Sequence, residues 1–463
     1  MAESTTRPEL RRELGLIQAT ALAITDMIGI GPFITIPLFL STMGGPQAML
    51  GWVIGAVLAF CDGLVWDELG AALPKAGGSY NYLREAFGPA SAGRWFSFLI
   101  VWQIMFSAPL SVASGAIGFA NYFHYLVPTL SDRAIHVLAS CVPLVLILLL
   151  YRRIRTIGNL SVILLGGVLV GCAWVVASGL PHLSAARILD FPPDAFQLNW
   201  VFGVGLGHAT LYALYDYFGY YNVCYLAEEI RDPGRVVPRA ILFSIIAVAV
   251  LYLMMNVSIL SVVPWRDAQH STFIVSTYIE KLHGGWAGNL MTLLMLWIAF
   301  SSIFSLLLGY SRIPYAAAAD GNFFRMFGRL HPSGDFPHVS LVVLGLVASV
   351  FSLGHLPDVI GSLVATRVLV QYLPQAIGFF VLRYRRPDLP RPFRMWLYPL
   401  PGIVIILGWL YILGTSLPRS LAFAAVVFIL GSAVFFIRAR ITREWPFVAR
   451  QEHSASEGRG GGI

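Results

Sequence analysis

Four charged side chains lie inside long apolar stretches of this 463-residue chain: Asp26, Asp62, Asp216 and Arg367. At membrane depth, an ionisable group costs free energy unless it is paired, faces water or serves a function. Arg367 could pair with Asp216 as a gate, bind a carboxylate of a ligand, or form a buried ion pair that only fixes its helix. Three acids against one arginine leave carboxylates that could handle a cation.

Asp216 is the best candidate among these residues for handling a cation or a proton. A carboxylate that has lost water beside a cavity can exchange protons, and it can also bind an ammonium group. Asp26 lies one turn before an interruption of its apolar stretch and is a candidate for a gate or for coupling. Asp62 is expected to satisfy a neighbouring polar group.

Two apolar stretches are interrupted midway by glycine. The first covers residues 16–43 and is interrupted at 28–33 (IGIGPF); the second covers 198–230 and is interrupted at 212–222 (YALYDYFGYYN). In a bilayer, irregular backbone is tolerated only where it lines a cavity or is buried in protein, because lipid cannot pair with its amides and carbonyls. Two such interruptions in corresponding halves of a chain indicate the binding site of a transporter.

Each interrupted stretch is predicted to form two half-helices that meet near the membrane midplane. The amides that open a half-helix after Gly31 can hold a carboxylate, and carbonyls at the interruptions can hold an ammonium group, so a zwitterion fits the pattern. Pro32 suits the first turn of a new helix, because proline lacks the amide that would have no partner there. The alternative is a kink that serves only helix packing.

The composition indicates a membrane protein. Hydrophobic residues make up 57% of the chain, charged residues only 12%, and the mean hydropathy is +0.72. Soluble domains do not have this balance. Recurring apolar runs of about 20 residues predict an all-α integral membrane protein with 12 transmembrane helices. The predicted spans are 15–43, 47–72, 94–126, 133–151, 156–180, 197–230, 237–263, 286–316, 338–354, 357–383, 396–415 and 419–438.

The basic residues predict the orientation of these spans. If the N-terminus is inside, the inside segments hold 25 of the 31 Lys and Arg residues, the outside segments hold five, and Arg367 lies in mid-span. Because cytoplasmic loops retain Lys and Arg, both termini are expected in the cytoplasm. The compact loops favour the inner (cytoplasmic) membrane of a prokaryote. The tails would be 1–14 and 439–463, and the second is polar and glycine-rich enough to be disordered.

Several functional classes are disfavoured. The sequence contains no nucleophile elbow, HExxH pair or Walker loop, so neither an enzyme nor a cofactor is predicted. The net charge of +7 follows from the topology, and no nucleic-acid partner is expected. The cysteines all fall in predicted spans and lack the spacing of a zinc site or a disulfide framework; they are Cys61, Cys141, Cys172 and Cys224.

Four stretches, taken in this order, resemble the amino acid, polyamine and organocation (APC) superfamily of permeases. They are GIGPFITIP at 29–37, WDELGAALPKAGGSYNYLREAFG at 66–88, YLAEEIRDPGRVVPRAI at 225–241 and SRIPYAAAADGNFF at 311–324. The resemblance covers roughly the whole chain. It implies a leucine-transporter-like 5+5 inverted repeat with discontinuous helices 1 and 6. Here the two repeats would be 15–180 and 197–383, followed by appended helices 11 and 12 at 396–438.

The same resemblance implies where a substrate binds. The substrate would lie between spans 1 and 6 and be contacted by spans 3, 8 and 10. The backbone of the first break would bind an α-carboxylate through Ile28, Gly29, Ile30 and Gly31. The second break would contact the amine and the side chain through Tyr215, Asp216, Tyr217, Phe218 and Gly219. Tyr215 falls where similar permeases place an aromatic lid. Together with the intramembrane charges described above, this assigns gating or coupling to Asp26, Asp216, Arg367 and Tyr215.

Ion coupling is left open. Sodium-coupled members of this fold place a cation site where Ser301 and Ser302 stand here, although serines that bond to their own helix are the commoner explanation; no other metal site is predicted. Proton-coupled relatives often carry a lysine in span 5, whereas residues 156–180 contain no charged residue. Many relatives also read Gly-Trp-Asn after the second break, whereas this chain reads GYYN at 219–222.

These observations predict a secondary active transporter that moves amino acids across the cytoplasmic membrane by alternating access. The alternatives are a carrier for polyamines or other organic amines, and an amino acid exchanger without ion coupling. The expected partners are the small-molecule substrate, a proton or sodium ion if transport is coupled, and membrane lipid, with no obligatory protein partner. Aromatic residues near the breaks suit a neutral or aromatic side chain, Asp216 suits a cationic one, and Arg367 argues against polyamines.

Overall fold

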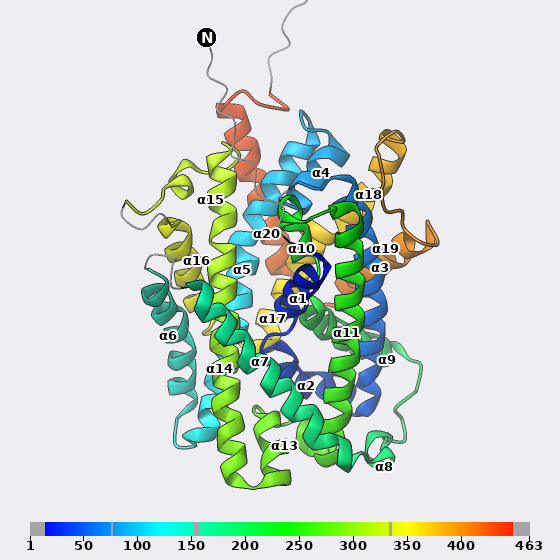
Figure 1. Cartoon of the computed structure of the whole chain (residues 1–463), viewed down its shortest axis with the longest axis vertical. Coiled ribbons are helices and arrows are strands. Elements are labelled where there is room, and N and C mark those ends of the chain that lie inside the picture. The colour runs from blue at the N-terminus through cyan, green and yellow to red at the C-terminus, as the bar shows by residue number, and fades with distance from the viewer. Residues whose placement is uncertain (1–13, 76, 152–156, 333–335, 448–463) are drawn as a thin grey trace, which may run out of the picture.

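A computed structural model describes residues 14–75, 77–151, 157–332 and 336–447, with the backbone alone for 157–165. Helices dominate these residues, and no β-strand is found among them. Figure 1 shows that most of the long helices run along the longest axis of the molecule. This arrangement agrees with the prediction of an all-α membrane protein.

Helices occupy all twelve of the predicted ranges. In chain order they are α1 (Leu16–Met27) with α2 (Gly31–Met43), α3 (Leu50–Ala72), α5 (Ala92–Leu126), α6 (Asp132–Leu150), α7 (Ile157–Gly179), α9 (Trp200–Tyr217) with α10 (Asn222–Tyr225), α11 (Pro233–Val262), α14 (Gly285–Tyr310) with α15 (Arg312–Ala319), α16 (His338–Phe351), α17 (Leu356–Arg367) with α18 (Leu373–Arg385), α19 (Leu400–Thr415) and α20 (Pro418–Ile441). The connections contain α4 (Ser79–Phe87), α8 (Ala185–Ile188), α12 (Trp265–Ala268) and α13 (Ile274–His283).

Fewer than the twelve predicted membrane spans are identified by helix length and hydropathy. Seven helices of the described residues are long and apolar enough to cross a membrane. The count rises to eight if α1 and α2, which are bent by 49° relative to each other, form one span together. Three shorter apolar helices cover Gly166–His182, His338–Phe351 and Leu400–Thr415. The chain is therefore a multi-pass membrane protein, while the total of twelve spans and the 5+5 inverted repeat stay predictions.

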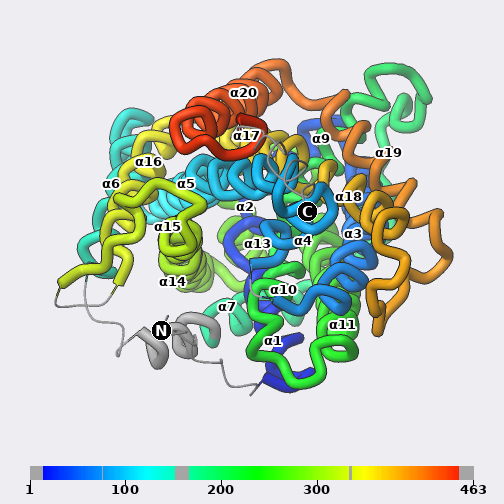
Figure 2. Tube along the Cα trace, turned by 90° about the horizontal axis from the view of Figure 1, so that it is seen from above, coloured from blue at the N-terminus to red at the C-terminus, as the bar shows by residue number. Residues whose placement is uncertain are grey.

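The long helices form two packed groups with the interrupted ones between them. In one group α5 packs against α6, α14, α16 and α17; in the other α3 packs against α9 and α11. Figure 1 places α1, α2 and α10 between the two groups, and Figure 2 shows the same helices from above. Contacts of α1 with α11 and of α2 with α9 join both halves of the first interrupted stretch to the second group.

Small residues let α3 and α9 approach closely. Gly51 and Gly55 lie one turn apart on α3 and face Ala209 and Ala213 on α9; a Cβ at either glycine would lie 2.6 Å from the alanine Cβ opposite. Helices in a bilayer associate through such close packing, because lipid tails leave no hydrophobic driving force between helices. This contact fixes α9 against α3.

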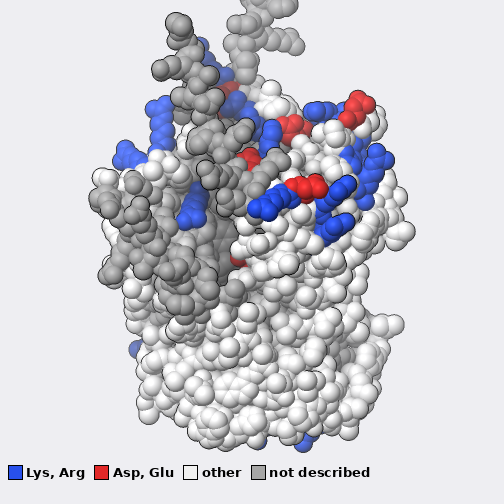
Figure 3. Space-filling view, viewed as in Figure 1, with Lys and Arg blue, Asp and Glu red and all other residues white. Residues whose placement is uncertain are grey.

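Charged residues gather at one end of the molecule. Figure 3 shows Lys and Arg at the end where Figure 1 places α4, α15 and α18, with a broad belt almost free of charge below it. An uncharged belt is what the hydrocarbon core of a bilayer requires. The charged end carries segments that the sequence predicts to be inside.

A buried ion-pair cluster holds the segment after α18 against α3. Glu68 is 1% exposed and accepts hydrogen bonds from Arg383 Nε and from the Met395 amide, both at 2.7 Å. Arg391 Nε lies 3.2 Å from Oε1 of the same carboxylate, the oxygen that also accepts from Arg383 Nε. The Arg383 guanidinium also lies 3.8 Å from the centre of the Tyr398 ring. One carboxylate therefore organises the connection between α18 and α19.

We expect Glu68→Gln to lower the free energy of unfolding by about 3 kcal/mol or more, because it leaves two largely buried arginines without their negative partner. Thermal unfolding of the purified protein in detergent measures this loss. Glu85→Gln is the matched control, because the pair of Glu85 with Arg386 is 3.8 Å long and partly exposed; such a pair contributes at most about 1 kcal/mol. Equal losses for both variants would contradict a structural role of the cluster.

Candidate functional site

The first interrupted stretch changes direction at Ile28, Gly29 and Ile30. Helix α1 ends at Met27 and α2 begins at Gly31, so the irregular backbone is shorter than the 28–33 predicted from the sequence. The Ile30 amide donates to Ser302 Oγ of α14 at 3.2 Å, and Ser302 in turn donates to the Ile298 carbonyl at 2.9 Å. The Gly31 amide has no hydrogen-bond partner among the described residues. It is therefore a free donor at the N-terminus of α2.

The second interruption lies directly against the first. Helix α9 continues to Tyr217 and α10 begins at Asn222, so the interruption covers 218–221 instead of the predicted 212–222. Gly219 has φ of +130°, and a Cβ there would lie 2.6 Å from the Asp26 carbonyl oxygen. Only glycine combines this backbone conformation with this close approach. The two interruptions are thus packed backbone to backbone.

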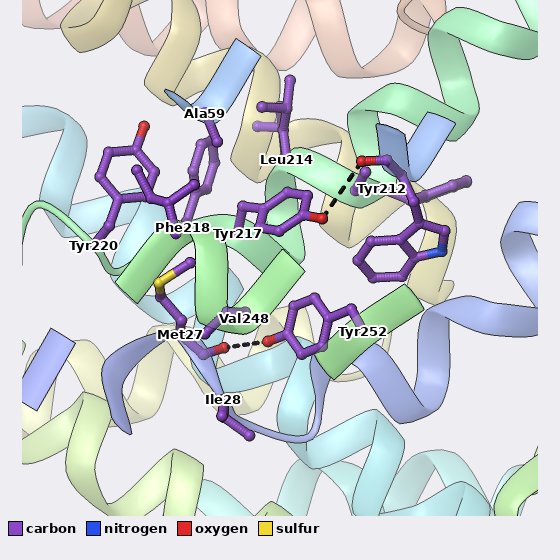
Figure 4. Packing of buried hydrophobic residues seen from close by; sticks show 14 of the residues in the cluster. Met27, Ile28, Ala59, Tyr212, Leu214, Tyr217, Phe218, Tyr220, Val248 and Tyr252 are labelled. Atoms are coloured by element: carbon purple, nitrogen blue, oxygen red, sulfur yellow. Dashed lines mark hydrogen bonds between the residues drawn. The ribbon is translucent and has the colours of Figure 1, made fainter. Parts of the chain in front are cut away.

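A tyrosine of α11 bridges the two interruptions. Tyr252 Oη donates to the Met27 carbonyl at 2.8 Å and lies 3.3 Å from the Asp216 carbonyl. Figure 4 shows its hydroxyl pointing at Met27, with Tyr217 at the end of α9 and Phe218 of the second interruption nearby. The Tyr252 hydroxyl therefore pairs carbonyl groups that an unbroken helix would have satisfied itself. Tyr252 was not predicted from the sequence, where nothing distinguishes it except that it is a polar aromatic residue inside an apolar span.

Asp216 meets the start of α2. Its Oδ2 accepts a hydrogen bond from Thr35 Oγ1 at 2.6 Å, and both side chains are buried. Its Oδ1 has no partner among the described residues and lies in close contact with the position that a Cβ on Gly31 would take. A free carboxylate oxygen and the free Gly31 amide are therefore neighbours. Thr35 was also missed, because a threonine in an apolar helix gives no sequence signal.

Tyr215 and Tyr217 have different surroundings although both belong to the predicted site. Tyr215 Oη shares a 2.8 Å hydrogen bond with Ser114 Oγ of α5, so it joins the two groups of helices. A contact between the groups is what a lid over a substrate needs. Tyr217 is fully buried and donates to the Trp52 carbonyl at 3.4 Å. It packs inside its own group and supports the site from behind.

Arg367 does not pair with Asp216. The proposed ion pair was wrong, as was the alternative of a buried ion pair fixing its helix: no carboxylate in the described part of the chain lies within ion-pair distance of Arg367. Its guanidinium donates to Tyr221 Oη at 2.8 Å and Tyr310 Oη at 2.6 Å. Helix packing places Arg367 beside the second interruption, where it contacts Tyr221 and the ring of Phe218.

The other two intramembrane acids have partners in the second interruption. Asp26 is exposed and accepts a hydrogen bond from Asn222 Nδ2 at 3.2 Å. Asp62 is buried and accepts from Tyr220 Oη at 2.6 Å and from Trp66 Nε1 at 2.9 Å. Asp62 thus satisfies neighbouring polar groups, as expected. The two acids therefore differ in exposure, since Asp26 is exposed and Asp62 is buried.

The serines of α14 remain open as cation ligands. The Ser302 hydroxyl already accepts from Ile30 and donates to its own helix. No group of three or more His, Cys, Asp or Glu residues that could hold a metal ion occurs in the residues described. A sodium site at Ser301 and Ser302 would have to use hydroxyl and carbonyl oxygens, and it stays a prediction.

A comparison with known families decides the class of protein. The model of a family described as amino acid permease matches residues 14–442. The chain belongs to this amino acid permease family. The match confirms the resemblance to APC superfamily permeases. The family and the relatives described next are transporters, so this permease is not an enzyme.

Three relatives of the permease are named amino acid transporters. Asc-type amino acid transporter 1 of Mus musculus is 28% identical, over 93% of this chain and 82% of that protein. Large neutral amino acids transporter small subunit 2 of Mus musculus is 26% identical, over 92% of this chain and 81% of that protein. Cationic amino acid transporter 4 of Mus musculus is 26% identical, over 84% of this chain and 62% of that protein.

We expect Gly31→Ala and Gly219→Ala to abolish amino acid transport by the permease. A methyl group at Gly31 would displace Asp216 and Tyr215, and one at Gly219 would meet the Asp26 backbone in a conformation that alanine avoids. Uptake into liposomes measures the effect. Gly203→Ala in α9 is the control, because no atom lies within 4 Å of the added methyl group. Normal transport by either site variant would show that the close contact is dispensable.

Tyr252→Phe should cost about 1 kcal/mol of stability, because it removes a buried hydrogen bond to the Met27 carbonyl, and it should also weaken amino acid binding. Tyr411→Phe is a matched control, since Tyr411 donates to the Gly203 carbonyl at 2.5 Å away from the interruptions. Thermal unfolding with and without amino acid separates the two effects. If both variants keep normal stabilisation by ligand, the bridge of Tyr252 does not position the site.

Proposed function

We propose that this permease is a secondary active transporter whose amino acid substrate binds between the two interruptions. The observation that carries the proposal is the meeting of Asp216 with Gly31, where a free carboxylate oxygen and a free amide lie side by side. An α-amino acid presents an ammonium group and a carboxylate a few ångströms apart. Asp216 would hold the ammonium group, and the amide at the N-terminus of α2 would hold the carboxylate.

The remaining residues of the proposed site surround this pair. Ile28, Gly29 and Ile30 shape the turn before the Gly31 amide. Tyr217, Phe218 and Gly219 form the other wall, and Tyr215 acts as the lid through its contact with Ser114. The lid bridges the two helix groups, so breaking that contact would open one side of the site.

Alternating access follows from this arrangement in our proposal. The group containing α1, α3, α9 and α11 moves relative to the group containing α5, α6, α14 and α16, and both interruptions act as hinges between half-helices. Asp26, Arg367 and Tyr215 are the proposed gate residues. Asp216 is the proposed coupling residue if a proton moves with the substrate; sodium coupling through Ser301 and Ser302, and exchange without coupling, are the other possibilities that the experiment below distinguishes.

The setting in the membrane is part of the proposal. We infer twelve spans in two inverted five-helix repeats, 15–180 and 197–383, with two appended helices, in the inner (cytoplasmic) membrane and with both termini in the cytoplasm. The charged end in Figure 3 supports this orientation. We also infer that the permease works without an obligatory protein partner, although one relative is named as a small subunit.

A carrier for polyamines or other organic amines is the second candidate. The free Asp216 oxygen favours it, because an ammonium group alone would satisfy this atom. The free Gly31 amide and the nearby guanidinium of Arg367 favour a substrate that also has a carboxylate. The amino acid is therefore the better match for the groups present.

Uptake into liposomes containing the purified full-length chain tests both candidates. Labelled amino acids and labelled polyamines are supplied with and without internal substrate, under imposed proton or sodium gradients. We expect saturable amino acid uptake, which Asp216→Asn lowers at least about tenfold, the equivalent of one charged hydrogen bond. Asp358→Asn, at a partly exposed 3.9 Å pair with Arg419, is the control and should transport normally.

Each other outcome has a definite meaning. Uptake of polyamines without amino acids selects the second candidate. Amino acid uptake that Asp216→Asn leaves unchanged removes Asp216 from the site. Uptake that requires internal substrate and ignores both gradients identifies an exchanger, and no uptake of any amine refutes the proposal.

The orientation has its own test. Leu189 and Tyr384 are 60% and 89% exposed and lie on opposite sides of the membrane in the proposed topology. We expect Leu189→Cys to react with a membrane-impermeant maleimide on spheroplasts, and Tyr384→Cys to react only after lysis. The unmodified chain gives the background, which comes from Cys141, the one exposed native cysteine in the described residues. The reverse pattern would place the N-terminus outside.

A further inference from the structure

Arg367 is a buried cation without a counter-charge. The residue is 5% exposed, and its guanidinium contacts two phenol hydroxyls, of Tyr221 and Tyr310. It also lies 5.6 Å from the ring centres of Phe218 and Tyr310. Within the parts of the chain that the structure describes, no carboxylate forms an ion pair with it. Hydroxyl groups and ring faces attract a cation but leave its charge uncompensated.

The guanidinium of Arg367, which has no carboxylate partner among the described residues, contrasts with the buried ion pairs of Glu68. Arg383 and Arg391 share the buried carboxylate of Glu68. Removing an arginine from water costs several kcal/mol. A carboxylate offsets this cost for Arg383 and Arg391, whereas no carboxylate of the described residues does so for Arg367. A residue left in this state inside a transport protein marks a place where a charge arrives from outside the chain.

Arg367 lies next to the proposed amino acid site. Its two contacts in the second interruption, Phe218 and Tyr221, flank Gly219. Tyr215, the proposed lid, is within electrostatic range of both Asp216 and Arg367. An amino acid held at Asp216 and Gly31 would therefore have Arg367 near Phe218 and Gly219, the residues that we propose as the other wall of the site.

The backbone also changes at this residue. Helix α17 ends at Arg367, and residues Val368–Tyr372 form a wider helical turn before α18. Such widened turns occur frequently at functional sites, because they shift the side chains that precede and follow them. Here the turn directs Arg367 to the second interruption and Tyr372 to Phe218, whose ring centre is 4.9 Å away.

We propose that Arg367 is a specificity-determining residue that reads the charge of the substrate's side chain. It admits amino acids whose side chain carries a carboxylate or another oxygen acceptor and rejects amino acids with a cationic side chain. The inference rests on the proposed function and names its substrate class. A planar guanidinium matches a carboxylate with two parallel hydrogen bonds, whereas a like charge in a site of low dielectric constant is repelled.

Binding of a matched series of amino acids tests this assignment. Glutamate, glutamine and lysine have side chains of similar length that are anionic, neutral and cationic. Each competes with a transported amino acid on the purified full-length permease in liposomes. We expect wild type to bind glutamate and glutamine at least about tenfold more tightly than lysine, an effect of a single nearby charge. Equal binding of all three by the wild type would overturn the proposal.

Substitutions locate the effect at Arg367. Arg367→Met keeps the length without the charge, and we expect it to reduce the preference for glutamate over lysine at least about tenfold. Arg367→Lys keeps the charge and should still reject lysine, while losing part of its affinity for glutamate. Tyr310→Phe removes one hydroxyl partner, keeps the charge and should also reject lysine. If Arg367→Met folds, as thermal unfolding shows, and keeps the wild-type preference, the assignment fails.

The outcomes separate this inference from the proposed function. If no amino acid binds or is transported by the wild type, the proposed function fails and the inference fails with it. If amino acids are transported with a charge preference that is the same in wild type and Arg367→Met, only the assignment of Arg367 fails. If Arg367→Met does not fold, Arg367→Lys decides the matter: a variant that binds glutamate as tightly as the wild type would show that the guanidinium does not contact the substrate's side chain, and the assignment would fail.

Discussion

The need to pair every backbone amide and carbonyl inside a bilayer is the constraint on which this structure depends. An unbroken helix meets it automatically, whereas the interruptions after Met27 and Tyr217 do not. Side chains from other helices supply the missing partners: Ser302 receives the Ile30 amide, and Tyr252 donates to the Met27 carbonyl. In the same way Tyr122 donates at 3.0 Å to the Phe33 carbonyl of α2, whose partner in the helix would be Pro37, a residue without an amide. The Gly31 amide is left over, and it is the group that the proposed substrate would complete.

The same reasoning divides the buried charges into two kinds. Glu68 is surrounded by two arginines and a backbone amide, and Asp62 by a tyrosine and a tryptophan, so these carboxylates have their partners within the protein. Asp216 keeps one oxygen free, and Arg367 has hydroxyls and rings but no counter-charge. Charges with full partners hold helices together, whereas charges with incomplete partners are available to a ligand. Among these four residues, this difference separates the scaffold from the proposed site.

Glycine serves two physical purposes in the fold. Gly51 and Gly55 on α3 permit close helix packing, so they build a rigid group of helices around α9. Gly31 and Gly219 permit contact between the two interruptions, where a side chain would meet Asp216 or the Asp26 backbone. A rigid group beside two irregular hinges is a suitable mechanical basis for a transporter, because motion is then concentrated at the hinges.

The sequence by itself determined the membrane character, the ranges that became helices, the existence of both interruptions and the family, because apolar runs and glycine positions are local signals. It also indicated Asp216 and Arg367 as unusual. It placed the start of the second interruption too early, since α9 continues through Tyr212 to Tyr217. The pairing of Asp216 with Arg367, one of the alternatives that it left open, is absent from the described residues. Only the tertiary structure decided those partners: Thr35 lies 181 residues from Asp216, and Tyr221 lies 146 residues from Arg367. Which side chains meet across helices depends on how the helices rotate and cross, and local sequence signals do not specify that geometry.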